Sequence, residues 1–469
     1  PFRLLFVKTN RRRGGFVENV TMENVTCENV WRVFGLETDV VYQWKRFPDY
    51  EIRLTPIDGI TMRNIRCGTS PRLEPAFHIV GDTRQKPRNL RFENVTLGEA
   101  EGEQFLVKNA ENVEFVNVKL GAHAKPQSTA NRVLDELRAW DLETDESWRR
   151  LTDRADYDNH RRQLADRMRR AFGPLPERTP LNAVTTGTVR RDGYRVEKVM
   201  FESRPHYHVT GHFFVPEAPD CKPPYQAVLI VCGHSEDGKL SAMYQYGAAE
   251  CAKAGFATFV IDPVDQGERC QFGVHGKFTT TRGHNLAGSR AALLGEEFAF
   301  WRIWDAMRAI DWLYARDDIR KDGVGVMGNS GGGTMTSWMR AVDDRVTASA
   351  ASCYISTLRD VCAAIGPQDA EQQIYGELKI GLNHAGLQLV RDAPGLICCK
   401  WKDFFPIEGS RETLGVMKTV ASQIGELHNW EMCDADGPHG WVPSTIEGSI
   451  LWMRAHLRGE SGVLPLDLP

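Results

Sequence analysis

A serine between glycines stands in the segment Gly328-Asn329-Ser330-Gly331-Gly332. The apolar run 324–327 precedes it, and a helical pattern over 332–341 follows. Glycines at a turn from strand to helix permit close backbone contacts and leave the serine hydroxyl exposed. The pattern therefore predicts a nucleophile, Ser330, at the carboxyl end of a buried strand. A phosphate-binding loop is the competing interpretation, but the segment lacks the Lys-Ser or Lys-Thr ending of such loops.

A serine nucleophile needs a base, and the base needs an acid that orients it. Asp403 follows the predicted strand 396–400, and His439 lies in a glycine-flanked loop after the predicted strand 430–433. Serine, then acid, then histidine is the chain order of the α/β-hydrolase triad. We therefore predict Asp403 as the acid and His439 as the base. The alternative acids nearby are Asp434, Asp436 and Glu408.

The charge that develops on an attacked carbonyl oxygen needs two backbone N–H donors. Gly331, directly after the nucleophile, is expected to supply one. The loop 233–239 after the predicted strand 227–232 is expected to supply the other, at His234. The His234 side chain could instead ligate a metal, but no second or third ligand follows at a matching spacing. We therefore predict no metal and no cofactor.

Strand-like and helical runs alternate from residue 195 onward, which predicts a mostly parallel sheet with helices on both faces. The first two strands lie close together with no helix between them, which suits an antiparallel start. The predicted strands are 195–201, 208–215, 227–232, 257–261, 324–327, 346–353, 396–400 and 430–433. The predicted helices are 241–254, 291–315, 332–341, 412–424 and 444–457.

Residues 180–457 resemble the serine carbohydrate esterases of the acetyl xylan esterase-like α/β-hydrolases. The resemblance implies ester hydrolysis on a sugar or polysaccharide without a cofactor, with the catalytic roles on Ser330, Asp403 and His439. Gly233-His234 stands where relatives carry Gly-Tyr. The segments that carry the resemblance are Pro180-Leu181-Asn182, Arg191-Asp192-Gly193-Tyr194, Gly233-His234, Asp265-Gln266-Gly267-Glu268-Arg269, 303–311 and 328–333. Within 303–311, we expect Asp305, Arg308 and Asp311 to be buried structural partners.

A repeat opens the chain: alternating apolar residues lead to an Asn that is followed by Val or Ile. Strands of this kind recurring every few tens of residues predict stacked coils, as in a β-solenoid, with a β-sandwich as the alternative. Cys27 and Cys67 each lie three residues after a repeat Asn, which suits stacking at one position. The four repeats end at Asn24-Val25, Asn64-Ile65, Asn94-Val95 and Asn117-Val118.

Residues 5–20 resemble the substrate-binding region of the polygalacturonase family, right-handed β-helix enzymes that cut pectin. Lys8 matches the lysine of that family's Arg-Ile-Lys motif, but Phe6 stands where its arginine should be. The family's catalytic aspartates and histidine motif are absent. We therefore predict a partial right-handed parallel β-helix over 1–122 without glycosidase activity. Lys8 and Arg11 to Arg13 are candidate contacts for an acidic pectin chain.

The remaining features set the domain boundaries and exclude some partners. Residues 128–172 carry helical spacing and mixed charges, which predicts a helical connector over 123–179 with a solvated charged face, before an esterase domain over 180–469. The net charge of −4 argues against nucleic acid or a membrane surface as the main partner. The chain begins with Pro1, so a signal peptide is neither claimed nor excluded, and no oligomeric state is predicted.

These observations together predict a polysaccharide ester hydrolase. The pectinase-like segment favours plant cell-wall pectin as the substrate, and hence a secreted or periplasmic protein. The methyl ester of galacturonate is slightly favoured, and an O-acetyl ester of pectin or xylan is the alternative. A methylesterase should keep a cation near the acyl group, for which Arg269 and Arg282 are candidates. A non-catalytic pectin-binding protein with a remnant hydrolase fold is the alternative of another class.

Overall fold

The computed structural model describes residues 3–10, 14–38, 53–70, 75–100, 104–122, 129–272, 280–364, 369–425 and 429–460. The chain divides into two compact units, Pro1–Gln127 and Ser128–Pro469. Each unit has its own hydrophobic core. In the ranges above, no helix combines the length and apolar character needed to cross a membrane.

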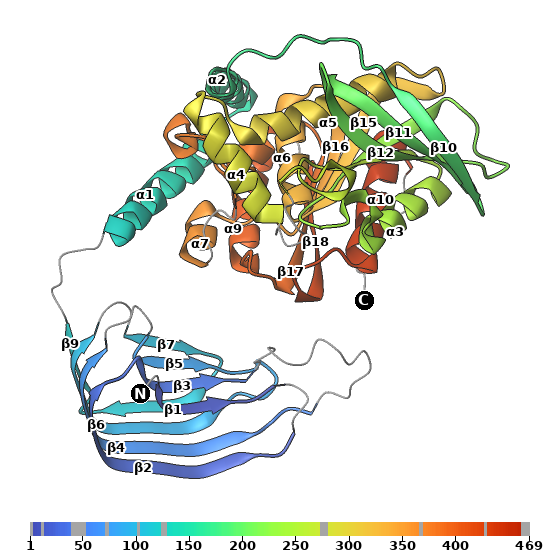
Figure 1. The fold of residues 1–469 in the computed structure, drawn as a ribbon. Coiled ribbons are helices and arrows are strands. Elements are labelled where there is room, and N and C mark those ends of the chain that lie inside the picture. The colour runs from blue at the N-terminus through green and yellow to red at the C-terminus, as the bar shows by residue number, and fades with distance from the viewer. Residues whose placement is uncertain are drawn as a thin grey trace. The chain divides into compact units, whose positions relative to one another are not determined.

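The strands of the first unit alternate between two parallel sheets (Figure 1). The apolar side chains between the sheets include Ile60, Phe77 and Leu90, all fully buried. The first sheet has the order β1 (Arg3–Lys8), β3 (Arg32–Glu37), β5 (Phe77–Val80) and β7 (Phe105–Lys108). The second has the order β2 (Val17–Asn29), β4 (Ile57–Ser70), β6 (Arg88–Ala100) and β8 (Glu111–Val116), and β9 (Lys119–Ala122) also pairs with β6.

The repeat asparagines form a ladder across the second sheet. Asn24, Asn64, Asn94 and Asn117 all have φ between 53° and 59°, a left-handed conformation that asparagine tolerates better than most residues. Each amide donates to the preceding one, from Asn64 to Asn24 at 3.0 Å, from Asn94 to Asn64 at 3.1 Å and from Asn117 to Asn94 at 2.7 Å. Cys27 lies opposite Cys67 in the same register. The repeat therefore marks a bend that recurs at one position of successive strands.

The second unit contains a sheet in the order β10-β11-β12-β14-β13-β15-β16-β17-β18. Antiparallel pairing joins β10 to β11, β11 to β12 and β12 to β14, and the other strands are parallel, as the sequence predicts. The sequence missed β10. The strands are β10 (Val184–Arg191), β11 (Tyr194–Arg204), β12 (Tyr207–Pro216), β13 (Tyr225–Val231), β14 (Ala257–Ile261), β15 (Ile319–Asn329), β16 (Val346–Ser352), β17 (Gly395–Lys402) and β18 (Trp430–Pro438).

Helices cover both faces of this sheet because successive side chains of a strand point to opposite sides. The helices are α3 (Ala242–Lys253), α4 (Thr280–Leu293), α5 (Phe298–Tyr314), α6 (Gly331–Val342), α7 (Leu358–Ala364), α8 (His384–Leu389), α9 (Ile407–Ile424) and α10 (Pro443–Arg458). On β13, Leu229 and Val231 join one core with residues of α5, α6 and α9, whereas Val228 and Ile230 join the other with residues of α3 and α10. The predicted helix 291–315 spans the end of α4 and the whole of α5, with a turn at Gly295.

The predicted connector forms α1 (Thr129–Arg149) and α2 (Arg154–Phe172), and both belong to the second unit. Asp141 and Asp145 on α1 are fully buried and bind the Arg359 guanidinium at 2.7 Å and 3.0 Å. The Asn383 amide donates to both carboxylates. A solvated charged face is therefore wrong for these two acids, because cross-chain partners compensate for their burial.

Candidate active site

The predicted nucleophile lies on a sharp turn between β15, which ends at Asn329, and α6, which begins at Gly331. Ser330 has φ 61° and ψ −124°, a strained conformation for a residue with a side chain. A Cβ at Gly328 or Gly332 would lie 2.2 Å or 2.1 Å from the carbonyl oxygen of Val231. Only glycine fits at these two positions. The geometry is that of a nucleophile elbow, as the sequence predicts.

The structure brings Asp403 and His439 together. His439 Nδ1 donates to Asp403 Oδ1 at 2.7 Å, and the same oxygen accepts from the backbone N–H of Phe405 at 3.1 Å. The imidazole stacks on the Phe404 ring, with centroids 4.1 Å apart. The Asp403 side chain is 1% exposed and that of His439 is 22% exposed. This bond fixes the tautomer of His439 and leaves Nε2 as the basic nitrogen.

The alternative acids have other partners in the described part of the chain. Asp434 accepts from Trp401 Nε1 at 2.9 Å, and Asp436 accepts from the backbone N–H of Gly437 at 2.8 Å. Glu408 is exposed in the first turn of α9. Among the candidates named from the sequence, the geometry therefore favours Asp403 as the acid.

Cys353 lies beside this pair, and its Sγ approaches the Asp403 carboxylate and the His439 ring. We call Cys353, Asp403 and His439 the His439 group. Ser330 N donates at 2.8 Å to the carbonyl of Ser352, the residue before Cys353. Burial, with the Asp403 charge, raises the pKa of the Cys353 thiol and keeps it neutral. Between the described residues, no hydrogen bond joins Ser330 Oγ to His439, so the full triad remains a prediction.

The two predicted oxyanion donors come from segments in close contact. A Cβ at Gly233 would lie 3.0 Å from the nitrogen of Gly331, so the backbone of the loop after β13 packs directly on the elbow. The N–H of Gly233 donates to Tyr244 Oη at 2.6 Å. The next N–H along the chain is that of His234, the donor that the sequence predicts.

A buried lysine fastens this loop to the end of β14. Lys239 is 1% exposed, its ammonium pairs with Asp262 and Glu268, and its backbone N–H donates to Asp262 at 2.7 Å. Ser235 N donates to Gln266 Oε1 at 2.7 Å. The segment 265–269, which carries part of the family resemblance, therefore holds the oxyanion loop in position.

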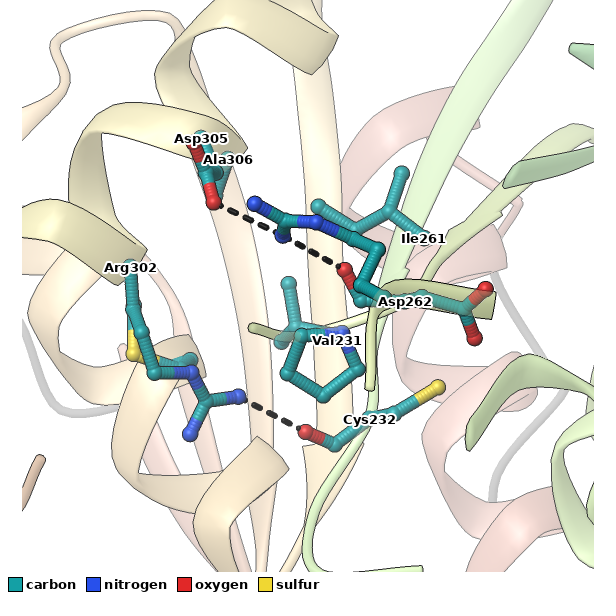
Figure 2. A pocket seen from close by; sticks show the side chains of 10 residues that line it. Val231, Cys232, Ile261, Asp262, Arg302, Asp305 and Ala306 are labelled. Carbon is teal, nitrogen blue, oxygen red and sulfur yellow. Dashed lines mark hydrogen bonds and ion pairs between the residues drawn. The ribbon is translucent and has the colours of Figure 1, made fainter. Parts of the chain in front are cut away.

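Arg269 does not reach a substrate, so that prediction is wrong. Its side chain is 2% exposed, pairs with Asp305 at 2.8 Å and donates to the carbonyl of Asp262 at 2.9 Å. These partners and Arg302 line a cavity of about 10 Å³ (Figure 2). This is about the room that one water needs, and far too little for a sugar.

The other side chains named from the sequence are either structural partners or substrate contacts that stay predictions. Asp305 and Arg308 are each 3% exposed, as the predicted buried partners should be, whereas Asp311 is only partly buried and pairs with Arg178 at 3.0 Å. Arg282 is exposed on α4, and Lys8 is exposed at the end of β1 in the first unit. Their substrate contacts remain predictions. Arg11 to Arg13 lie outside the described residues.

The sequence missed a second histidine–carboxylate group, formed by His234, His284, Asp369 and Glu371, which we call the His234 group. Asp369 Oδ2 lies 2.5 Å from His234 Nε2 and 2.8 Å from His284 Nδ1. Burial opposes the charge of Asp369, but the hydrogen bonds of the two imidazoles hold the pKa of that carboxyl well below its usual value. Sequence spacing could not reveal this group, because its members come from three distant segments.

The His234 group lies against the nucleophile elbow. A Cβ at Gly331 would lie 2.1 Å from Glu371 Oε1 and 3.0 Å from His234 Cε1. Arg302 on α5 pairs with Glu371 and donates to the carbonyl of Cys232 at 2.9 Å. Burial lowers the pKa of Arg302 to about 10. The group therefore supports the region in which an oxyanion would form.

Comparisons with known proteins agree with this fold. Residues 133–356 match the model of the Abhydrolase family. YtaP of Bacillus subtilis, assigned as a hydrolase, is 28% identical over 185 residues, which cover 38% of this chain and 58% of YtaP. The chain thus spans less than two thirds of that curated relative.

Two solved structures share the architecture at low sequence identity. A Bacteroides fragilis protein, assigned as an acetyl xylan esterase, is 15% identical with a TM-score of 0.53, over 66% of this chain and 83% of that one. Methylesterase BT1017 is 17% identical with a TM-score of 0.54, over 77% of each chain. The predicted α/β-hydrolase fold is confirmed, and the names of these proteins agree with the predicted enzyme class.

Proposed function

We propose that this chain is a serine carbohydrate esterase that acts on pectic polysaccharide. The observation that carries the proposal is the 2.7 Å hydrogen bond between His439 and Asp403, in a fold that also holds Ser330 on a nucleophile elbow. A serine on an elbow and an imidazole oriented by a buried acid are the parts that acyl transfer needs. The names of the similar proteins, a hydrolase and two esterases, support the same reaction class.

In the proposed reaction, Ser330 Oγ attacks the ester carbonyl while His439 Nε2 takes its proton. The N–H groups of Gly331 and His234 stabilise the oxyanion of the tetrahedral intermediate. His439 then protonates the leaving alcohol, and an acyl-serine remains. Water attacks this acyl group, again with His439 as the base, and releases the acid. Asp403 orients the imidazole and stabilises its cation throughout.

The favoured substrate is the methyl ester of galacturonate in pectin. The first unit supports a pectin context: its strands alternate between two parallel sheets, and its repeat asparagines bond in a ladder. We interpret these strands as coils of a right-handed parallel β-helix like that of polygalacturonases, kept as a platform for the polymer. Lys8 and Arg282, both exposed, remain the proposed cations for an acidic chain. A polymer substrate of the plant cell wall implies a secreted or periplasmic enzyme.

Two alternatives remain. An O-acetyl ester of pectin or xylan passes through the same intermediate, and one of the two similar structures is assigned to acetyl xylan. The names of the similar proteins fit both esters and do not separate them. A non-catalytic pectin-binding protein is the alternative of another class, and the bonded Asp403–His439 pair argues against it.

The decisive experiment incubates the protein with methylated pectin and with acetylated pectin, and measures released methanol and acetate separately. The Ser330→Ala variant serves as the matched control. Methanol released by the parent chain, and not by the Ser330→Ala variant, supports the methylesterase. Acetate alone selects the alternative ester, and the absence of both products leaves the non-catalytic binder.

A further inference from the structure

The four polar side chains of the His234 group converge on one point beside the elbow. One ligand atom from each of His234, His284, Asp369 and Glu371 lies within 4.8 Å of the others. The side chains of His284, Asp369 and Glu371 are 0% exposed, and that of His234 is 12% exposed. Buried carboxylates are costly unless a cation or donor compensates for them. Arg302 compensates Glu371, whereas Asp369 faces the two imidazoles.

Hydrogen bonds alone satisfy the polar atoms of the His234 group poorly. His284 Nε2 lies 3.0 Å from the carbonyl oxygen of Val264, and a carbonyl can only accept, so Nε2 carries a proton. A neutral His284 then points the lone pair of Nδ1 at Asp369 Oδ2, only 2.8 Å away. The alternative, an imidazolium, would place a full positive charge on a side chain that is 0% exposed. A cation at the centre of the group removes this conflict.

We propose that the His234 group is a binding site for one divalent transition-metal ion, of which Zn²⁺ is the best fit. Two imidazoles and two carboxylates are a ligand set that Zn²⁺ accepts in tetrahedral geometry. Bonds of ~2.05 Å give a tetrahedral edge of ~3.3 Å between ligand atoms. The His234 Nε2 to His284 Nδ1 distance is 3.3 Å, while Glu371 Oε2 lies 3.5 Å from His284 Nδ1 and the other oxygen, Oε1, lies 3.6 Å from His234 Nε2.

The contact between His284 and Val264 is the support that a metal ligand usually has. A ligating histidine commonly donates its other ring N–H to a carbonyl, which fixes the ring and its tautomer. The two distances from Asp369 Oδ2 to the rings are shorter than a tetrahedral edge: the one to His234 Nε2 is that of a hydrogen bond, and the one to His284 Nδ1 is the lone-pair contact described above. Metal binding therefore expels the proton between His234 Nε2 and Asp369 Oδ2 to solvent, and the two atoms move apart.

Four protein ligands fill a tetrahedral site, so we assign this ion a positioning role rather than contact with the substrate. It would join the oxyanion loop at His234 to α4 and to the segment 369–371. His234 Cε1 and Glu371 Oε1 both lie against Gly331, so the ion would fix the surroundings of one predicted oxyanion donor. This inference concerns the ion alone and stands apart from the identity of the ester.

The test uses the whole chain, stripped with a chelator, reloaded with Zn²⁺, desalted and measured by elemental mass spectrometry. We expect about one Zn²⁺ per chain, and at least a fivefold loss in His284→Gln and in Asp369→Asn. The control variants His212→Gln, a buried histidine elsewhere, and Cys353→Ser, in the His439 group, should retain the ion. Less than about half an equivalent in the parent chain overturns the proposal. Metal retained by the His284 and Asp369 variants overturns it as well.

Co²⁺ gives a readout on the parent chain that does not depend on the folding of any variant. Binding to the His234 group should produce the visible absorption of tetrahedral Co²⁺ without a thiolate-to-metal band in the near ultraviolet, since the group has no sulfur. A thiolate band would place the ion at a cysteine, such as Cys353, and would refute the assignment. The absence of tetrahedral absorption would refute it too.

Discussion

The His439 group and the His234 group both combine histidine with carboxylate, but they present these side chains differently. In the His439 group, one carboxylate binds one imidazole, and the ring remains 22% exposed. In the His234 group, two carboxylates and two imidazoles enclose one another, and three of the four side chains have no exposed surface. A base must reach its substrate, whereas a structural ligand must not. Exposure therefore separates the two roles where residue type does not.

The two groups also differ in how the fold supplies them. Asp403 and His439 stand at or just beyond the carboxyl ends of β17 and β18, at the edge where α/β sheets place their active sites. His284 comes from α4, and Asp369 and Glu371 come from the turn at 369–371, outside the described helices and strands. The first arrangement follows from the strand order, and the second requires loops to meet in space.

The largest effect is expected from Ser330→Ala, because the hydroxyl, base and acid act as a unit. Hydrolysis of a small soluble ester should fall by a factor of ~10⁶. Steady-state kinetics on the purified variant, with circular dichroism to verify its fold, give the measurement. A variant that keeps a tenth of the activity would mean that neither histidine group serves a serine nucleophile at this elbow.

A smaller loss, by ~10⁴, is expected from Asp403→Asn, which keeps the shape of the acid but no longer stabilises the His439 cation. Asp436→Asn is the matched control, since Asp436 lies nearby but bonds to the Gly437 backbone instead. The comparison is made on kcat, with both variants measured at the same pH. If Asp436→Asn causes the large loss of kcat and Asp403→Asn causes only a small one, the catalytic acid is Asp436 and not Asp403.

Asp369→Asn tests the His234 group on activity. We expect kcat to fall by ~10- to 100-fold, because a supporting ligand positions the oxyanion loop without touching the substrate. The pH profile should keep its shape, since the base His439 is unchanged. A loss of kcat as large as that of Asp403→Asn, with a displaced pH profile, would mean that the two groups do not differ in role.

Much of the fold was readable from the sequence because the hydrophobic pattern sets it. Buried strands such as β13 and β14 are continuous apolar runs, and the glycines at 328 and 332 permit contacts with Val231 that a side chain would block. The bond between Asp403 and His439 followed from their positions at strand ends. Strand β10 was not predicted because its residues show no alternation of apolar and polar side chains. Along this strand only Gly187 and Val189 are partly buried.

The features that the sequence did not predict depend on pairs of residues that lie far apart in the chain. The sequence predicts a substrate contact at Arg269, but Asp305 and the carbonyl of Asp262 bind its guanidinium inside the unit. Asp141 and Asp145 looked solvated until Arg359, more than two hundred residues later, paired with both. No local spacing encodes such partners. The His234 group was missed for the same physical reason.

The smallest effect is expected at His212, a buried imidazole of β12 that belongs to neither group and gives a baseline for them. Burial, with the nearby Lys239 charge, lowers the pKa of His212 to about 4. Because the folded pKa lies below the unfolded one, the stability from neutral His212 is present above pH 6.5 and is lost as the pH falls toward 4. Urea denaturation at pH 7 and pH 5 should therefore show His212→Gln losing ~2 kcal/mol less stability than the parent chain over that interval. Equal losses in the two proteins would mean that His212 takes up its proton over the same pH range in the folded and unfolded states, and that burial does not keep this imidazole neutral.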